Sequence, residues 1–280
     1  LTTAQVAALS TNQVKGLTTS QVGALASRQI GALGTASIAA LSTSQIAALS
    51  DASVPGLTSA QISSLTTLQV EALKTSQVAL LSSTQVAALG TDDLAVFSTA
   101  ELAALSSSAI LGLSTTALAS LSADRIAVLG TTGGIQGLST SQMASLTSEQ
   151  LAGLTTVQIA SLGSRQVAAI STANMAALTT AQIAALSTAG ITGLSSEQIA
   201  KLNTSQVEAF NTAQVGAFTS LQVSALGTDD LGTFSTAELA ALTSSAVAGL
   251  SADTLASLSA DRIATFGTAS IAGLSTAQIA

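Results

Sequence analysis

Two pairs of adjacent carboxylates are the densest charges in this sequence. Asp92-Asp93 lies in the phrase Leu-Gly-Thr-Asp-Asp-Leu, which recurs at Asp229-Asp230. Repeated carboxylates could bind Ca²⁺, which takes six to eight oxygen ligands. Only Glu101 and Glu238, one in each neighbourhood, could join the pairs. Acids in the first turn of a helix also complement the helix dipole, so the sequence favours that role, with calcium binding as the alternative.

Other residue types that carry chemistry are missing. The chain has no His and no Cys, which removes the commonest general base and every thiolate metal site. The many Ser and Thr hydroxyls have no base to activate them as nucleophiles. Asp124-Arg125 and Asp261-Arg262 are adjacent opposite charges, expected to be solvated surface pairs. We therefore predict no enzyme activity, no catalytic residue, no cofactor and no metal ligand.

The charge and hydropathy of the chain argue against two classes of interaction, with nucleic acids and across a membrane. Charged residues are 8% of the chain and the net charge is −7. An acidic surface repels phosphate backbones, so nucleic-acid binding is not expected. Ser, Thr or Gln interrupts every apolar run, so no stretch is long enough to span a membrane.

The chain that must position any site is built from one eight-residue repeat, called the octad here, which recurs almost without interruption. Its consensus is Leu-Ser/Thr-Thr/Ser-x-Gln-Val/Ile-x-Ala/Gly, and it fills 1–128 and 138–273, with a nine-residue unit at 129–137. Apolar residues fall at positions 1 and 6 of each octad. A straight helix would turn this stripe away from one face by about 80° per octad, and strict strand alternation would split it between two faces.

An interrupted helix fits the octad better. Ser or Thr at position 2 with Gln or Glu at position 5 is the capping-box pattern, as in Thr2 with Gln5. Positions 3 to 8 would form a short helix, and Gly or Ala at position 8, with Gly at position 2 in some units, would let the chain turn. We predict an all-α repeat, a solenoid of very short helices with one helix per eight-residue unit; a β-solenoid is the alternative. Leu or Phe at position 1 should face the core, and position 4 should be exposed.

A second period of 137 residues lies above the octad. Ser27-Arg28-Gln29 recurs as Ser164-Arg165-Gln166, and Ser122 to Ile126 recurs at 259–263. We therefore predict a first seventeen-unit module at 1–137, a second at 138–273 and the start of a further module at 274–280. Neither end carries a polar cap, so we expect the array to continue in a longer chain or in neighbouring subunits.

The octad itself carries two resemblances. Leu-Thr-x-x-Gln-Val-x-Ala resembles the opening helix of repeats in TAL-effector DNA-binding proteins, whose second helix, base-reading loop and basic character are missing here. Over its whole length the chain resembles octapeptide-repeat regions of very large bacterial surface or adhesin-like proteins. This resemblance implies a structural protein at the cell surface or outside the cell, and it marks no functional residue.

We therefore expect an extracellular filament, sheath or adhesin stalk that self-associates or continues in a longer chain. The alternative is a binding module that presents periodic Ser and Thr rows to a polysaccharide, ice or mineral surface. Threonines at positions 2 and 3 of many octads motivate this alternative.

Overall fold

The computed structural model describes residues 1–129 and 134–279, and every element in these ranges is a short helix. The chain divides into two compact units, Leu1–Ser145 and Leu146–Ala280. No strand occurs among the described residues. The prediction of an all-α solenoid with one short helix per octad is confirmed, and the β-solenoid alternative is wrong.

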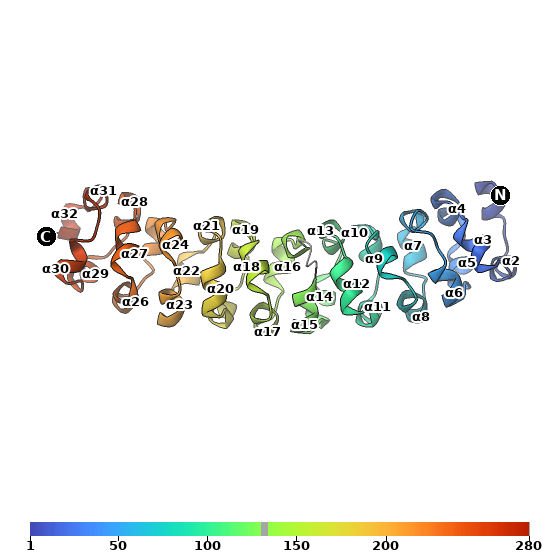
Figure 1. The fold of residues 1–280 in the computed structure, drawn as a ribbon, viewed down its shortest axis with the longest axis horizontal. Coiled ribbons are helices and arrows are strands. Elements are labelled where there is room, and N and C mark those ends of the chain that lie inside the picture. The colour runs from blue at the N-terminus through green and yellow to red at the C-terminus, as the bar shows by residue number, and fades with distance from the viewer. Residues whose placement is uncertain (130–133, 280) are drawn as a thin grey trace. The chain divides into compact units, whose positions relative to one another are not determined.

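In the described residues of the first unit, α-helices and two 3₁₀-helices follow one another at about octad spacing (Figure 1). Its elements are α1 (Thr3–Ala7), α2 (Thr11–Lys15), α3 (Thr19–Gly23), α4 (Ser27–Ala32), α5 (Thr35–Ala39), α6 (Thr43–Ala47), η1 (Val54–Gly56), α7 (Ser59–Ile62), α8 (Thr67–Glu71), α9 (Thr75–Val78), α10 (Ser83–Val86), α11 (Thr91–Val96), α12 (Thr99–Ala104), α13 (Ser107–Ile110), α14 (Thr115–Ser120), α15 (Ala123–Val128), η2 (Gly134–Gly137) and α16 (Thr140–Ala144).

The second unit has the same construction. Its elements are α17 (Ser148–Ala152), α18 (Thr156–Ala160), α19 (Ser164–Ala168), η3 (Thr172–Ala177), α20 (Thr180–Ala185), α21 (Thr188–Ile191), α22 (Ser196–Ile199), α23 (Thr204–Glu208), α24 (Thr212–Gly216), α25 (Ser220–Val223), α26 (Thr228–Thr233), α27 (Thr236–Ala241), α28 (Ser244–Val247), α29 (Ala252–Ala256), α30 (Ala260–Ile263), α31 (Thr268–Ile271) and α32 (Thr276–Ile279).

The predicted capping boxes begin most of these helices. In α6, Ser42 Oγ accepts a hydrogen bond from the Gln45 backbone N–H at 3.2 Å, and the Ser42 backbone N–H donates to Gln45 Oε1 at 2.7 Å. Two amide groups that a helix start leaves unpaired are thereby satisfied. Helices of four to six residues are too short to be stable alone, so contacts between coils must hold them.

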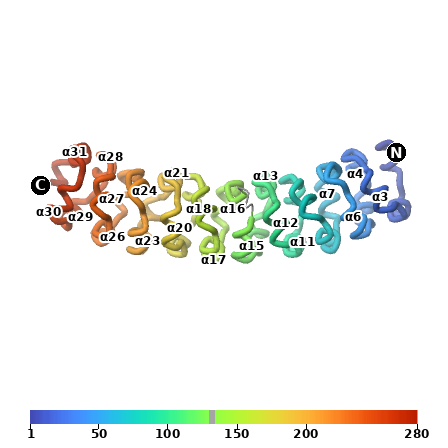
Figure 2. The backbone as a smooth tube through the Cα atoms, in the orientation of Figure 1, coloured from blue at the N-terminus to red at the C-terminus, as the bar shows by residue number. Residues whose placement is uncertain are grey.

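Those contacts join helices that lie three octads apart in the sequence. In the first unit α1 packs on α4 and α10 packs on α13; in the second, α24 packs on α27. Within each unit, three successive octads therefore complete one coil before the chain returns above its starting point, as the tube trace lets the reader follow (Figure 2).

The core of each unit is built from positions 1 and 6 of the octad. Val6, Val14 and Val22 at position 6 are fully buried, and Leu154 at position 1 is 3% exposed. The five phenylalanines all lie at position 1 and are all buried, as predicted: Phe97, Phe210, Phe218, Phe234 and Phe266. Val157 at position 4 is 77% exposed, which confirms that this position faces solvent.

Glycine at position 8 has a different role from the predicted one. Gly16 has φ −77° and Gly153 has φ −75°, and no glycine with described surroundings has a positive φ. Glycine is therefore not needed for the turn, since other residues adopt these angles. A Cβ added to Gly193 would instead lie 2.1 Å from the Ser164 carbonyl oxygen. These glycines let two coils approach closely.

The same close approach recurs at matching places of the 137-residue repeat. Gly56 matches Gly193, and a Cβ on it would meet the Ser27 carbonyl oxygen at 2.1 Å. Gly112 and Gly249 are a second matching pair, where the added Cβ would meet the carbonyl oxygens of Ser83 and Ser220 at 2.0 Å. The nine-residue unit at 129–137 lies partly outside the described residues, and the modules at 1–137, 138–273 and 274–280 stay a prediction from sequence.

Candidate functional site

The glutamine at position 5 makes the contact that repeats most regularly between coils. Gln61 is 1% exposed, and its side-chain Nε2 donates to the carbonyl oxygens of Ile30 at 2.8 Å and Leu33 at 2.7 Å. Those two carbonyls flank the corner between two octads of the preceding coil. One amide group thus fixes one coil on another.

The same contact occurs along both units, and we call the glutamines that make it the glutamine ladder. Each donates from Nε2 to a position-6 carbonyl and a position-1 carbonyl of the coil before. The ladder includes Gln45, Gln61, Gln69, Gln77, Gln85 and Gln142 in the first unit and Gln182, Gln198, Gln206, Gln214, Gln222 and Gln278 in the second.

Both ends of the ladder amide are used at once. In Gln61 the Oε1 atom accepts from the Thr58 backbone N–H at 2.8 Å while Nε2 bonds to the coil before. A buried amide that loses a partner costs about 1–3 kcal/mol, so a shift between coils that is not a whole octad is penalised. The ladder therefore fixes how octads align between successive coils.

Sequence reasoning assigned position 5 to capping only and missed this second bond. The preference for Gln at position 5 indicates the second bond. Glu can make the same cap, as Glu101 and Glu238 do, yet Gln is far more frequent at this position. Only an amide can cap with its oxygen and donate with its nitrogen.

Arg125 and Arg262 replace the ladder glutamine at position 5. Arg262 Nη2 donates to the carbonyl oxygens of Leu231 at 2.8 Å and Phe234 at 2.7 Å, and Arg125 Nη2 donates to Leu94 at 2.6 Å. The prediction that these arginines form solvated surface pairs is wrong, because each guanidinium lies between coils. The Nε atom of each is buried, with no hydrogen-bond partner among the described residues.

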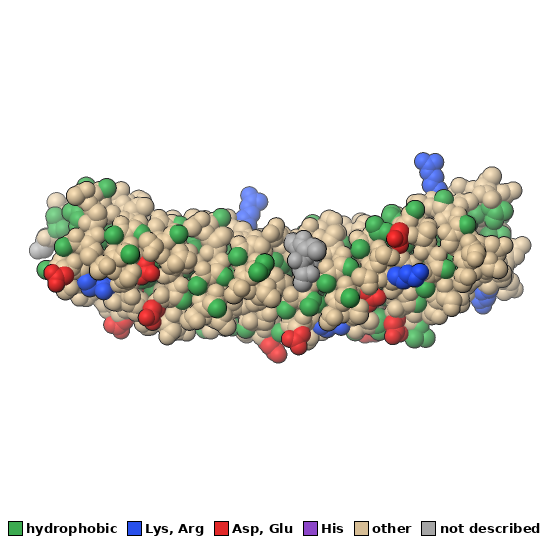
Figure 3. Space-filling model, viewed as in Figure 1, with side chains coloured by type: hydrophobic (Ala, Val, Ile, Leu, Met, Phe, Trp, Pro, Cys, Tyr) green, Lys and Arg blue, Asp and Glu red, His purple; other side chains and the backbone are tan. Residues whose placement is uncertain are grey.

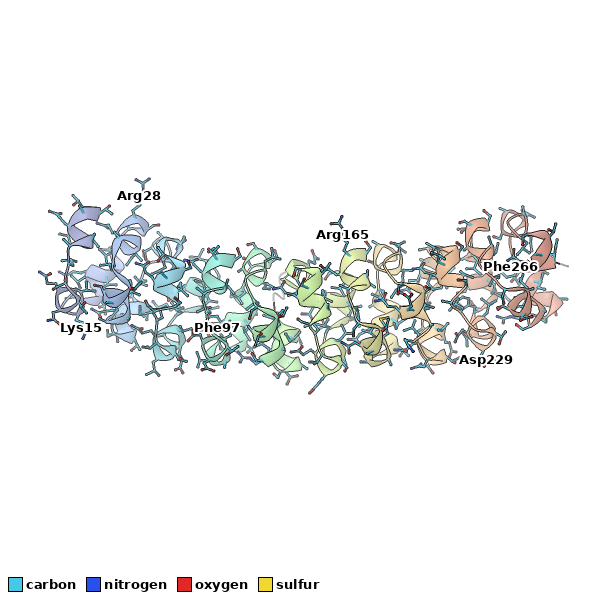
Figure 4. The ribbon with its side chains drawn as sticks, turned by 180° about the vertical axis from the view of Figure 1, so that it is seen from behind. Lys15, Arg28, Phe97, Arg165, Asp229 and Phe266 are labelled. Atoms are coloured by element: carbon cyan, nitrogen blue, oxygen red, sulfur yellow. The ribbon has the colours of Figure 1, made fainter. Side chains whose placement is uncertain are left out.

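The acid pairs lie at helix starts. Asp93 Oδ2 accepts from the Gly90 backbone N–H at 3.0 Å, and Asp230 Oδ2 accepts from Gly227 at the same distance. Asp92 and Asp229 are exposed (Asp229 is labelled in Figure 4). Among the residues that the structure describes, no group of three or more acids could hold a metal ion. Asp93 and Asp230 thus cap their helices, and all four acids lie in the first turn of a helix.

Charged side chains are sparse on the surface. The face shown in Figure 3 is mostly uncharged, with isolated acidic and basic side chains. Arg28 and Arg165, which occupy matching places of the long repeat, are both exposed and project away from the ribbon (Figure 4). None of the described helices has the length and apolar character needed to cross a membrane.

Short capped helices, stacked in coils and joined in many octads by a buried glutamine amide, define a helical octad-repeat solenoid. The profile of the ALTTAQ repeat matches the chain at residues 1–27, 23–59, 54–91, 86–123, 151–180, 167–204, 200–228 and 223–260. Since these matches cover most of the sequence, the chain belongs to the ALTTAQ repeat family. No curated protein matches it.

Proposed function

We propose that the chain is a structural protein that forms an extracellular filament, sheath or adhesin stalk and catalyses no reaction. The observation that supports this proposal most is the glutamine ladder, because it joins coils by backbone carbonyls rather than by particular side chains. Any octad with Gln at position 5 can therefore be added to the stack. Length can grow by repetition while each coil contacts only its neighbours.

The exposed positions support the same proposal. Position 4 carries residues as different as Ala4, Arg28, Leu68 and Val157, which indicates that no single surface chemistry is required there. A structural array tolerates such variation, whereas a specific binding surface would restrict it. The resemblance to octapeptide-repeat regions of bacterial surface proteins adds the extracellular location to the proposal.

Electron cryo-microscopy of native material from the producing cells tests the proposal. It predicts fibres or stalks on the cell surface or in the medium that an antibody to the octad repeat decorates. Protease treatment of intact cells should remove that signal. Dispersed single molecules inside the cell would contradict both the structural role and the location.

The second candidate is a binding module for a polysaccharide, ice or mineral surface. Position-2 hydroxyls are used in helix caps, but position-3 threonines such as Thr35, Thr43 and Thr75 are exposed at octad spacing. Thermal hysteresis and glycan-array binding of the purified chain test this candidate. If the chain shows no activity in both assays, the binding-module candidate is excluded.

A further inference from the structure

The glutamine ladder has a gap of four successive octads at matching places of the two units. We call residues 89–120 and 226–257 the ladder gaps. In place of glutamine, position 5 holds Asp93, Glu101, Ala109 and Ala117 in the first gap and Asp230, Glu238, Ala246 and Thr254 in the second. Within the part of the chain that the structure describes, none of these side chains donates a hydrogen bond to the preceding coil.

The acids in the gaps retain the helix cap but cannot make the contact between coils. Glu101 Oε2 accepts from the Ser98 backbone N–H at 2.6 Å, as a ladder glutamine does with Oε1. An ionised carboxylate only accepts hydrogen bonds, so Glu101 has no proton to donate to the carbonyl oxygens of Val70 and Leu73. Those carbonyls lie 31 and 28 residues before it, the spacing that Gln61 uses.

Carbonyl groups of the coil before each gap therefore lack the ladder contact. In the first unit, the position-1 carbonyl oxygens of Leu65, Leu73 and Leu81 accept no hydrogen bond from any described residue, and in the second unit the same holds for Leu202 and Phe210. All five residues are buried. A buried acceptor without a partner is unfavourable, so these two interfaces between coils should be less stable than the ladder-bonded ones.

Apolar packing nevertheless continues across the gaps. Leu102, Leu105 and Ile110 are fully buried, and α13 packs on α10. A Cβ added to Gly112 would meet the Ser83 carbonyl oxygen, so the two coils approach closely there. Burial of apolar surface keeps the interface closed at rest, but it is not directional. What the gap lacks is the set of directed bonds.

Ladder bonds flank the first gap on both sides. Gln85, in the coil before the gap, donates to the carbonyl oxygen of Leu57 at 2.8 Å. Gln142, after the gap, donates to the carbonyl oxygens of Ile110 and Leu113 at 2.9 and 2.7 Å. The gap is thus tied to the coil after it and not to the coil before it, which confines the weakness to one interface.

We propose that the solenoid opens first at these two interfaces when the chain is under tension: between 57–88 and 89–120 in the first unit, and between 194–225 and 226–257 in the second. Opening one gap would release 32 residues, about 110 Å of extended chain, while the ladder-bonded coils stay stacked. A stalk or filament built this way lengthens in steps instead of breaking. The inference rests on the proposed structural function for its use, whereas the weak interface is a property of the purified chain.

Single cysteines test the proposal, because the chain has no Cys of its own. Ile62→Cys, Ile110→Cys and Ile183→Cys place matched thiols at position 6, where all three isoleucines are 0% exposed. Ile62 and Ile183 follow the ladder glutamines Gln61 and Gln182, whereas Ile110 lies in the first gap. We expect the Ile110→Cys thiol to react with a soluble disulfide reagent at least about tenfold faster than the other two.

The order of the three rates excludes simple fraying. Ile110 is the most central of the three positions, so opening from either end would label Ile62→Cys or Ile183→Cys first. Equal rates, or a slower rate at Ile110→Cys, would overturn the proposal. Circular dichroism should give the same helix content for the three variants.

A repair variant tests the cause of the opening. Glu101→Gln restores a ladder donor inside the gap, whereas Glu71→Gln removes the same charge from an exposed side chain of the coil before it. Combined with Ile110→Cys, Glu101→Gln should slow labelling at least about threefold and Glu71→Gln should leave it unchanged. Labelling that is equally fast with both changes would contradict the missing ladder bond as the cause.

Optical tweezers supply the readout under tension. The parent chain should show two low-force steps of about 110 Å each, and a chain with both Glu101→Gln and Glu238→Gln should show them at higher force. Identical force–extension curves for the two chains would overturn the proposal. Neither readout depends on where the native protein occurs, so a location inside the cell would remove the filament or stalk and leave the weak interfaces in place.

Discussion

The Nε2 atom of Gln61 lies 2.7 Å from the carbonyl oxygen of Leu33, 28 residues earlier in the chain. The bond joins a side chain to a backbone group, so it does not depend on which residue occupies position 1. This explains how Leu33 and Phe234 can accept equivalent bonds from Gln61 and Arg262. It also explains how octads that differ at positions 4 and 7 stack alike.

Substitution by serine should lower the stability strongly at position 1 of an octad and hardly at all at position 4. Leu154 is 3% exposed and Val157 is 77% exposed. Leu154→Ser should lower the free energy of unfolding by about 2–5 kcal/mol, because it removes buried apolar surface and leaves a cavity. Val157→Ser should change it by less than about 0.5 kcal/mol. Equal shifts in melting temperature would contradict the octad register.

Replacing a glycine by alanine should lower the free energy of unfolding at one position of the second unit and raise it at another. Gly193→Ala places a Cβ 2.1 Å from the Ser164 carbonyl oxygen, and we expect a loss of about 1–3 kcal/mol. Gly232 lies inside α26 with no atom within 4 Å of its added Cβ. Gly232→Ala should stabilise by about 0.5–1 kcal/mol through helix propensity. Chemical denaturation compares them; a stable Gly193→Ala chain would rule out the close approach.

Arg262→Gln should retain the contact between coils and remove an unpaired donor. The glutamine can donate to Leu231 and Phe234 as other ladder residues do, and the buried Nε without a partner disappears. We expect a gain of about 1 kcal/mol in the free energy of unfolding. Arg165→Gln, at an exposed position, is the control and should change it by less than about 0.5 kcal/mol. A lower stability for Arg262→Gln would show that the guanidinium is required.

The acid pairs should behave as caps rather than as calcium ligands. Asp93→Ala removes the acceptor for the Gly90 N–H and should cost about 1 kcal/mol. Asp92→Ala should be nearly neutral because Asp92 is exposed. Adding calcium or a chelator should leave the melting temperature of the parent chain unchanged. A calcium-dependent rise that Asp92→Ala abolishes would contradict the capping role.

Features that depend only on the residues of one octad could be predicted from the sequence. The capping box at Ser42 and Gln45, the burial of Phe97 and the exposure of Val157 follow from spacing within one octad, and all were predicted correctly. The contacts between coils were not, because Gln61 and Leu33 are brought together by the number of octads in a coil, which depends on the angle at every corner. Spacing along the chain does not specify that angle.

The missed roles of Arg262 and Gly193 have the same origin. Both residues contact backbone carbonyls of the preceding coil. Arg262 donates to the carbonyl oxygens of Leu231 and Phe234, and Gly193 leaves room for the carbonyl oxygen of Ser164. Within the octad, Arg262 resembles half of a surface ion pair and Gly193 resembles a turn residue. Only the coil-to-coil register separates these interpretations.

Hydrogen exchange in a Gln61→Glu chain tests most directly whether the buried amide holds the coils together. The substituted side chain can still cap α7 but presents a carboxylate to the carbonyls of Ile30 and Leu33. Gln5→Glu makes the same change at an exposed glutamine that also caps its helix, and serves as the control. We predict that backbone amides of α4, α5 and α7 exchange at least about tenfold faster in Gln61→Glu and at the parent rate in Gln5→Glu. Equal protection of these helices in all three chains would contradict the glutamine ladder as the element that joins successive coils.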